Sequence, residues 1–300
     1  MKGTLNRVIY IKSANMSSAK IKEEKSDLGR KRSMKAEEEL RAKVAEKIKK
    51  MEKRDRMLIK DRSSEMAVLE EVFDKSTLMT IYDFMNGGEI KEIYGVVDSG
   101  KESRIYWGIN SAGEEIAIKI FLTVSAEFRR GRLPYILGDP RFENVRKNLR
   151  SLVYLWAQKE FKNLKSAYEV KVRVPRPITV KNNVLLMEFI GKNGVSAPLL
   201  REVELKSPER TYRTILLHVK RLYRGAELVH GDLSEYNVMV FRGRPVLFDF
   251  SQAVSIKHPN AGQFLMRDVE NINRYFEKLG VNVIGVEEAY RVITGGAAIR

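Results

Sequence analysis

Residues 228–240 read LVHGDLSEYNVMV, and PVLFDF follows at 245–250. The alternation of apolar and polar residues predicts the short strands ELVH, NVMVF and VLFDF, the first two joined as a hairpin by the turn GDLSEY. Asp232 then leaves one strand, Asn237 opens the next and Asp249 ends the third. Phosphoryl transfer needs such a set: a carboxylate that accepts the proton of an attacking hydroxyl, and an amide and a second carboxylate that hold Mg²⁺. A structural turn rich in Asp and Asn would explain HGD alone.

A second candidate lies in EIAIKIF, residues 115–121. In a strand, the three isoleucines share one face, while Ala117, Lys119 and Phe121 share the other. A lysine between a small and an aromatic residue suits a nucleotide site, where the small residue lies against the base and the ammonium reaches phosphate. A strand with a solvent-facing lysine would give the same pattern.

The partner for this lysine comes from a helix expected over about Asn144 to Ala167. Its apolar stripe includes Trp156, and Glu160 occupies the next position of the same stripe. A buried carboxylate needs a partner, so we expect Glu160 to pair with Lys119. The alternative places Glu160 at the edge of the stripe, in water.

These motifs resemble those of protein kinases: HGDLSEYN and FDFSQ resemble H-x-D-x-x-x-x-N and D-F-G, and AIK with Glu160 resembles the kinase lysine and glutamate. The usual G-x-G-x-x-G loop is absent. In its place, DSGKESRIY at 98–106 resembles the S-x-G-K-E-x-x-x-Y loop of the RIO family of atypical serine/threonine protein kinases. LSEYN, WAQKEFKNL, LLMEFIG and KHPNA resemble the type-1 branch, and the similarity covers about Ser63 to the C-terminus.

The resemblance implies an α+β, two-lobed protein-kinase-like fold, with a small β-rich N-lobe, a reduced helical C-lobe and an N-terminal helical extension. We expect a basic, charged, partly helical or disordered extension over 1–62, N-terminal helices and the N-lobe over 63–189, and the reduced C-lobe over 190–300. No A-P-E element follows Asp249. The substrate-docking helices of ordinary kinases are therefore not expected.

The resemblance also implies an ATP site. Ser99, Gly100 and Lys101 would lie near the phosphates. Lys119 would bind the phosphates while Glu160 orients it. The segment Met187 to Ile190, with Glu188, would form the hinge that contacts adenine.

For catalysis, the resemblance makes Asp232 the base and makes Asn237 and Asp249 the ligands of Mg²⁺ or Mn²⁺, with Lys119 as the third catalytic candidate beside Asp232 and Asp249. Asp249 is also a candidate to accept phosphate transiently during ATP hydrolysis. The chain departs from the type-1 pattern at three neighbouring positions, where Gly231 and Ser103 replace the usual alanine and Phe250 replaces the usual valine. These residues surround the functional positions without replacing them.

Other patterns predict ordinary elements. Ser76 is expected to cap a helix that stops at Asn86-Gly87-Gly88. A hairpin is expected around Lys181-Asn182-Asn183 and a helix from about Pro208 to Arg224. Residues 122–143 read as a long loop whose single serine, Ser125, is a candidate for autophosphorylation.

Composition limits the classes of protein and of site. The chain has no cysteine and three histidines, which excludes disulfides and thiolate metal sites and favours a hard cation on oxygen ligands. The apolar runs are too short to span a membrane, and we expect a cytoplasmic protein. The net charge of +16 favours polyanionic partners, although solubility alone would also explain it.

The resemblance to the RIO family implies an ATP-dependent kinase or ATPase that acts in small ribosomal subunit maturation, with the pre-small-subunit particle and rRNA as partners. Two alternatives stay open. One is a small-molecule phosphotransferase similar to aminoglycoside or choline kinases, which the loop DSGKES and the short C-lobe disfavour. The other is a non-catalytic RNA-binding assembly factor that uses ATP as a conformational switch.

Overall fold

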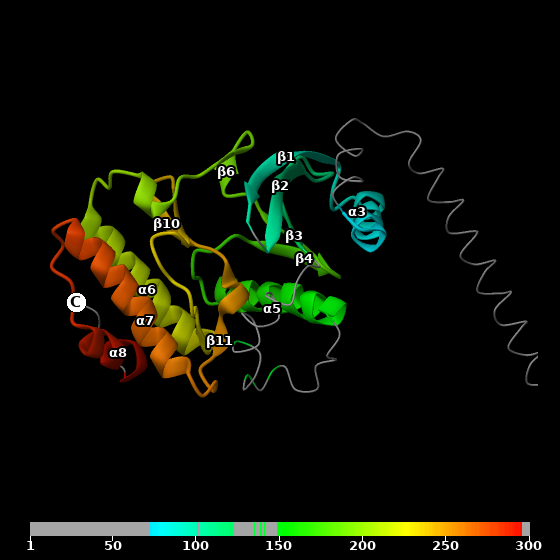
Figure 1. Cartoon of the computed structure of the whole chain (residues 1–300). Coiled ribbons are helices and arrows are strands. Elements are labelled where there is room, and N and C mark those ends of the chain that lie inside the picture. The colour runs from blue at the N-terminus through cyan, green and yellow to red at the C-terminus, as the bar shows by residue number, and fades with distance from the viewer. Residues whose placement is uncertain are drawn as a thin grey trace, which may run out of the picture. The chain divides into compact units, whose positions relative to one another are not determined.

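The computed structural model describes residues 73–100, 102–122, 135, 139, 141 and 149–295, all within the unit Glu65–Arg300. A lobe built on a five-stranded sheet is followed by a lobe built on helices (Figure 1). The predicted two-lobed α+β fold is confirmed. The longer elements are α3 (Lys75–Gly87), β1 (Glu92–Ser99), β2 (Ser103–Ile109), β3 (Glu115–Phe121), α5 (Leu149–Glu169), β4 (Pro177–Lys181), β5 (Val184–Glu188), α6 (Pro208–Gly225), α7 (Ala261–Lys278) and α8 (Val286–Gly295).

The sheet has the order β1-β2-β3-β5-β4, and every neighbouring pair is antiparallel. Strand β3 is central, because β2 pairs with one of its edges and β5 with the other. The turn at 111–113 joins β2 to β3. Asn182, with φ of 52°, turns β4 into β5, as predicted. Lys119 is thus fixed on both sides by strand pairing.

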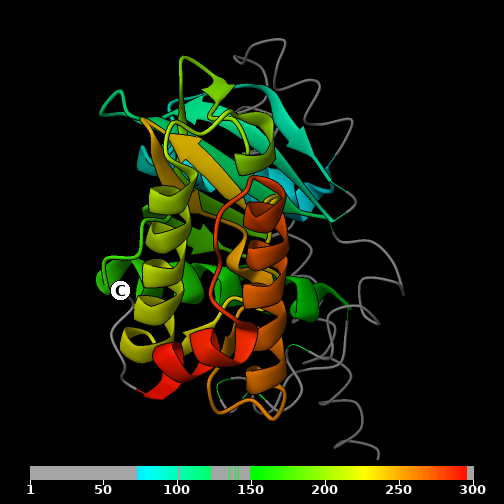
Figure 2. The ribbon, with the colours of Figure 1, turned by 90° about the vertical axis from the view of Figure 1, so that its left-hand side faces the viewer.

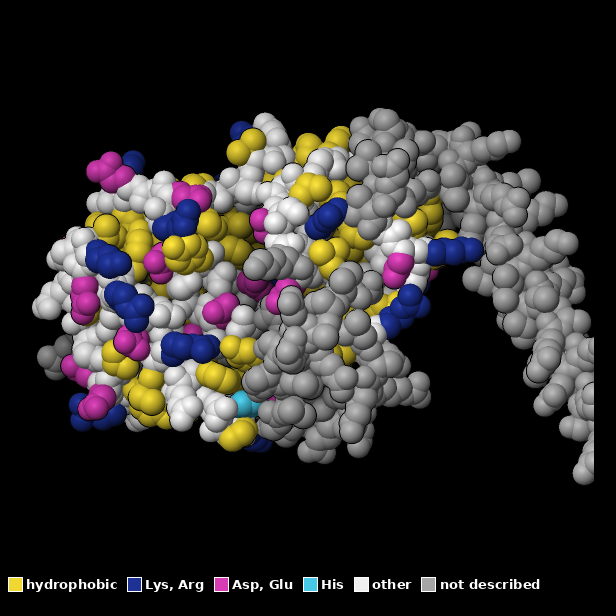
Figure 3. All heavy atoms as spheres, viewed as in Figure 1, with side chains coloured by type: hydrophobic (Ala, Val, Ile, Leu, Met, Phe, Trp, Pro, Cys, Tyr) yellow, Lys and Arg dark blue, Asp and Glu magenta, His cyan; other side chains and the backbone are white. Residues whose placement is uncertain are grey.

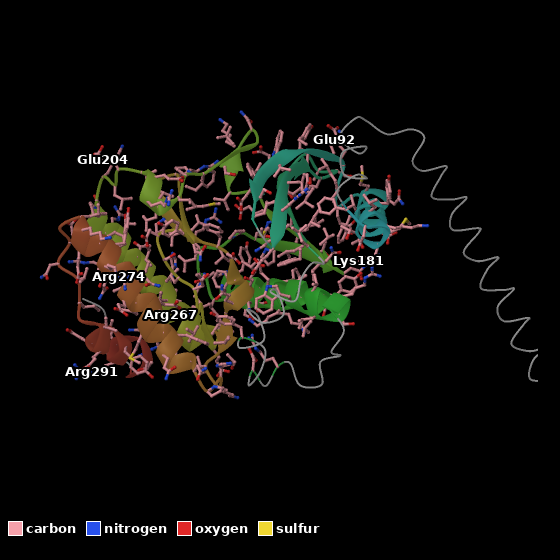
Figure 4. All side chains as sticks on the ribbon, viewed as in Figure 1. Glu92, Lys181, Glu204, Arg267, Arg274 and Arg291 are labelled. Carbon is pink, nitrogen blue, oxygen red and sulfur yellow. The ribbon has the colours of Figure 1, made fainter. Side chains whose placement is uncertain are left out.

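The two faces of the sheet pack against different helices, since side chains alternate along each strand. The β3 isoleucines pack on one face with Ile81 and Tyr82 of α3, and Phe121 packs on the other face with Trp156 of α5. Lys181 on β4 also forms an ion pair of 2.8 Å with Asp83 on α3 (Figure 4). The predicted alternation of EIAIKIF is confirmed, with both faces buried rather than one.

The first described helix begins two residues before the predicted position. The N-cap of α3 is Asp74, whose Oδ1 accepts a hydrogen bond from Thr77 N at 2.8 Å. Ser76 was the wrong choice: it lies inside the helix, and its Oγ lies 2.9 Å from the hydroxyl of Tyr154. The predicted stop is confirmed, because Gly88 adopts a left-handed φ of 82°.

In the helical lobe, α6 and α7 lie side by side and α8 crosses their ends (Figure 2). Short elements connect them to the sheet lobe. These are β6 (Gly191–Lys192), β7 (Val195–Ser196), η3 (Leu200–Glu202), β8 (Leu228–Val229), β9 (Val238–Phe241), β10 (Arg244–Leu247), η4 (Phe250–Gln252) and β11 (Val254–Ser255).

The predicted hairpin of ELVH with NVMVF is wrong. Strand β8 pairs instead with β11, through Val229 with Val254 and Leu228 with Ser255. Strand β9 pairs with β10. The segment that carries Asp232 is therefore a connection between two different strand pairs rather than a hairpin turn. It begins after β8, which pairs with β11, and ends at β9, which pairs with β10.

Several predictions concern residues outside the described ones: the extension 1–62, Lys101, Ser125 and most of the loop 122–143. The predicted start of α5 at Asn144 also lies outside, and the helix is described from Leu149. Among the described residues, no helix is long and apolar enough to cross a membrane.

Candidate active site

The Lys119 ammonium lies at the centre of the site. Its Nζ donates to Glu160 Oε1 at 2.9 Å and Oε2 at 2.8 Å, and to Asp249 Oδ1 at 3.2 Å. Lys119 is 5% exposed and Glu160 is 0% exposed. Both alternatives, a lysine that faces solvent and a glutamate at the edge of the stripe in water, are therefore wrong. The expected pairing of Lys119 on β3 with Glu160 on α5 is present. Asp249, which follows β10, is a second carboxylate partner of the same lysine.

The charges in this cluster stabilise one another. Burial alone would lower the pKa of the Lys119 ammonium, but the carboxylates of Asp249 and Glu160 raise it above its ordinary value. Burial alone would raise the pKa of the Asp249 carboxyl, but Lys119 and a hydrogen bond from Ser251 lower it well below its usual range. Lys119 is therefore a cation and Asp249 an anion at neutral pH.

The local backbone turns Asp249 toward the lysine. Asp249 follows β10 and caps η4 with a left-handed φ of 57°, and its Oδ1 accepts from Ser251 N at 3.4 Å. A non-glycine residue with positive φ is uncommon and marks a site where the surrounding structure fixes the conformation.

Asp232 and Asn237 lie in the turn between β8 and β9. Asn237 Nδ2 donates to the main-chain oxygen of Asp232 at 2.6 Å and lies 3.4 Å from its Oδ2. The Asn237 main-chain oxygen accepts from Phe248 N at 3.1 Å. The turn therefore lies against the segment that leads into Asp249, and the three polar residues predicted at strand ends come together.

Asp268 on α7 holds this turn through hydrogen bonds to its main chain, a contact that the sequence did not reveal. Its carboxylate accepts from Gly231 N at 2.8 Å and from Leu233 N at 2.9 Å, on either side of Asp232. Burial raises the pKa of Asp268 to about 7 in spite of these two bonds. Arg267, labelled in Figure 4, donates to the Gly231 main-chain oxygen.

Two further buried side chains tie α5 to the Asp249 segment. Lys159 is fully buried, and its Nζ donates to Ser251 O at 3.0 Å and to Ala253 O. Asn163, one turn later, donates to Phe250 O at 2.9 Å and to Ala253 O at 3.0 Å. Both residues lie near Glu160 on the helix, so the helix that orients Lys119 also holds the backbone after Asp249.

A cavity of about 520 Å³ opens beside these groups, within the usual size range of small-molecule sites. Asn237 and Asp249 are among the residues that line it. Most of the other lining residues are apolar. The lining includes Met187, Glu188 and Ile190 of the expected hinge, and also Ala117. The Glu188 side chain is held by Arg173, at 3.1 and 3.2 Å, and by Arg176 N at 3.0 Å.

The expected phosphate loop is described in part. Ser99 ends β1, Gly100 N donates to Ser103 O at 3.0 Å, and Asp98 lines the cavity. Lys101 lies outside the described residues. The phosphate-binding roles of all three expected residues stay predictions.

Comparisons with known proteins identify a family for the chain. The family model of the RIO domain matches residues 104–289. The chain is 39% identical to the RIO-type serine/threonine-protein kinase Rio1 of Haloferax volcanii over 80% of this chain and 81% of that protein. It is 37% identical to the protein of the same name from Methanocaldococcus jannaschii, over 77% and 78%.

More distant relatives share part of their length with the chain. The human serine/threonine-protein kinase RIO1 is 36% identical over 84% of this chain but 44% of its own length. Among solved structures, the Rio2 kinase ADP/Mg²⁺-phosphoaspartate complex from Chaetomium thermophilum matches with a TM-score of 0.55 and 25% identity, over 73% of this chain and 67% of that one. By the extent of these matches, the chain belongs to the RIO family of serine/threonine protein kinases, in its Rio1 branch.

Proposed function

We propose that the chain uses ATP and a divalent cation to phosphorylate serine or threonine, and also hydrolyses ATP, during maturation of the small ribosomal subunit. The observation that carries the catalytic part of this proposal is a set of contacts beside the cavity. Lys119 binds Glu160 and Asp249, Asn237 binds Asp232, and Asn237 and Asp249 line the cavity. Positioning and charge stabilisation account for most of the catalysis of phosphoryl transfer, and this cluster can supply both.

Asn237 and Asp249 fit a hard cation. Both line the cavity and carry side-chain oxygen atoms, and the Asp249 side chain is 39% exposed and ionised. Mg²⁺ is usually bound through one or two carboxylates together with substrate phosphates, so few protein ligands are needed. A bound Mg²⁺ would neutralise charge on the phosphate oxygens.

The remaining residues have separate roles in the proposal. Asp232 accepts the proton of the attacking hydroxyl, and Lys119, oriented by Glu160, binds phosphate oxygens. Asp249 is also the candidate for transient phosphorylation, and the phosphoaspartate in the described Rio2 complex supports this assignment. The hinge from Met187 to Ile190 contacts adenine, with Ala117 against the base.

The ribosomal part of the proposal is supported by charge. The net charge is +16, and Lys and Arg outnumber Asp and Glu in residues 1–62. On the face shown in Figure 3, basic and acidic side chains of the described residues are interspersed. We therefore assign rRNA affinity to the extension. Deleting residues 1–62 should lower RNA affinity and its salt dependence while ATP turnover persists; equal binding by the truncated chain would contradict this assignment.

The experiment for the catalytic proposal is phosphate release from magnesium-ATP, with and without purified small-subunit particles, beside phosphate transfer to protein. Wild type is compared with Asp232→Asn, Asp249→Asn and the exposed control Glu204→Gln (Figure 4). We expect both site variants to lose turnover, the control to match wild type, and the particles to stimulate turnover. Nucleotide binding without turnover by wild type under every condition would favour the switch, and turnover driven by a small-molecule alcohol would favour a metabolite kinase.

A further inference from the structure

Gln252 contacts the proposed base directly. Its Nε2 lies 3.0 Å from Asp232 Oδ2, the oxygen that Asn237 Nδ2 also faces at 3.4 Å. An ionised carboxylate can only accept hydrogen bonds, so the amide nitrogen of Gln252 must be the donor. The bond from Gln252 is the shorter of the two and therefore does more to set the rotation of the Asp232 carboxylate.

The backbone around Gln252 is held on both sides. Ser251 O and Ala253 O accept from buried Lys159, and Ala253 N closes η4 on Phe250 O at 3.2 Å. The Gln252 side chain thus projects from a fixed backbone, although the residue itself is half-buried. A donor held in this way can orient its acceptor with little loss of side-chain entropy.

Gly231 allows this close approach. It has a φ of +78°, and a Cβ on it would lie 3.1 Å from the Gln252 main-chain oxygen. The main chain before Asp232 and the main chain of Gln252 are therefore in near contact. Asp232 and Gln252 therefore lie on two chain segments that pack closely, because Gly231 has no side chain between them.

An amide suits a base better than a cation does. A lysine or arginine at this distance would lower the pKa of the Asp232 carboxyl and weaken it as a proton acceptor, because an opposite charge favours the ionised form. A neutral donor fixes the direction of the carboxylate with a smaller effect on its basicity. The chemistry of the pair therefore matches a positioning role.

We infer that Gln252 is a positioning residue that aims the Asp232 carboxylate at the attacking hydroxyl. This inference rests on the proposed function, since it needs Asp232 to act as the base. Gln252 would act on the chemical step through Asp232 and have little part in binding ATP.

The test compares wild type with Gln252→Leu, Gln252→Glu, Asp232→Asn and the control Gln263→Leu, an exposed glutamine on α7. We expect Gln252→Leu to lower kcat by roughly 10 to 100-fold, as for other residues that orient a reactive group, with KM for ATP changed less than about threefold. Gln252→Glu places a second carboxylate against Asp232 and should raise the pKa of the base. The acid limb of its pH–rate profile should then move to higher pH.

Thermal unfolding of each variant separates this effect from misfolding, and the shift of the pH profile is a readout that lost stability would not produce. If Gln252→Leu keeps a kcat within about twofold of wild type while Asp232→Asn is inactive, the inference fails and the proposed function stands. An unshifted profile for folded Gln252→Glu also overturns it. If Asp232→Asn keeps full activity, the base assignment fails and the inference fails with it.

Discussion

Lys159→Met tests whether α5 and the Asp249 segment form one rigid unit. Met has nearly the volume of Lys but cannot donate, so the variant removes the bonds to Ser251 O (3.0 Å) and Ala253 O. Ala253 O keeps a donor from Asn163 at 3.0 Å. The loss is therefore the Lys159 donor to the buried Ser251 carbonyl, at about 1 to 3 kcal/mol, plus the charged bond to Ala253 O, which keeps its neutral donor Asn163.

We expect the free energy of unfolding to fall by roughly 2 to 4 kcal/mol, measured by urea denaturation. The matched control is Lys165→Met on the same helix, an exposed position where such a change should stay within about 0.5 kcal/mol. Because the same bonds hold the backbone after Asp249, the Mg²⁺ concentration for half-maximal activity should also rise. Equal stability losses in the two variants, with unchanged Mg²⁺ dependence, would refute the reasoning.

Three other variants follow from contacts described above. Glu160→Gln leaves Lys119 with Asp249 as its charged partner, so kcat/KM for ATP should fall by about 100-fold in steady-state assays, and near-wild-type kinetics would contradict the pairing. Gly231→Ala and Gly243→Ala both force alanine to a positive φ, which costs about 1 to 2 kcal/mol, but only a Cβ at position 231 would also lie 3.1 Å from Gln252 O. Urea titrations should therefore show a larger loss of unfolding free energy for Gly231→Ala. Equal losses in the two variants would contradict this. Burial, with Arg221 nearby, lowers the pKa of His218 from 6.5 to about 4, so its contribution to stability is present above pH 6.5 and is lost as the pH falls toward 4. The stability of His218→Leu relative to wild type should accordingly improve by about 2 kcal/mol between pH 7 and pH 5, and a constant difference would be the contrary result.

The sequence predicted the strands and helices that carry strong periodicity. The alternation of EIAIKIF assigned the faces of β3, and the apolar stripe of α5 predicted a buried Glu160 in need of a partner. Both predictions depend on side-chain geometry within a single element. The contact between Lys119 and Glu160 could be predicted because a buried carboxylate requires a partner and Lys119 carries the opposite charge.

Other parts of the site depended on long-range contacts without a local signal. Lys159 and Asn163 lie on the same buried side of α5 as Glu160, but lysine is rarely buried, and their acceptors are main-chain carbonyls that any sequence provides. The pairing of β8 with β11 involves strands of two residues, which are too short for a periodic pattern. Asp74 and Ser76 are both common capping residues, so the choice between them required the coordinates.

The β8–β11 pairing has a consequence for motion between the lobes. It closes the chain from Leu228 to Ser255 into one loop, and Asp232, Asn237, Asp249 and Gln252 all lie within it. These groups can therefore keep their mutual geometry if the central strand and its lysine tilt away as a body. Such a tilt would stretch the 3.2 Å contact between Lys119 and Asp249, which joins the central strand to this loop, while the groups within the loop stayed together.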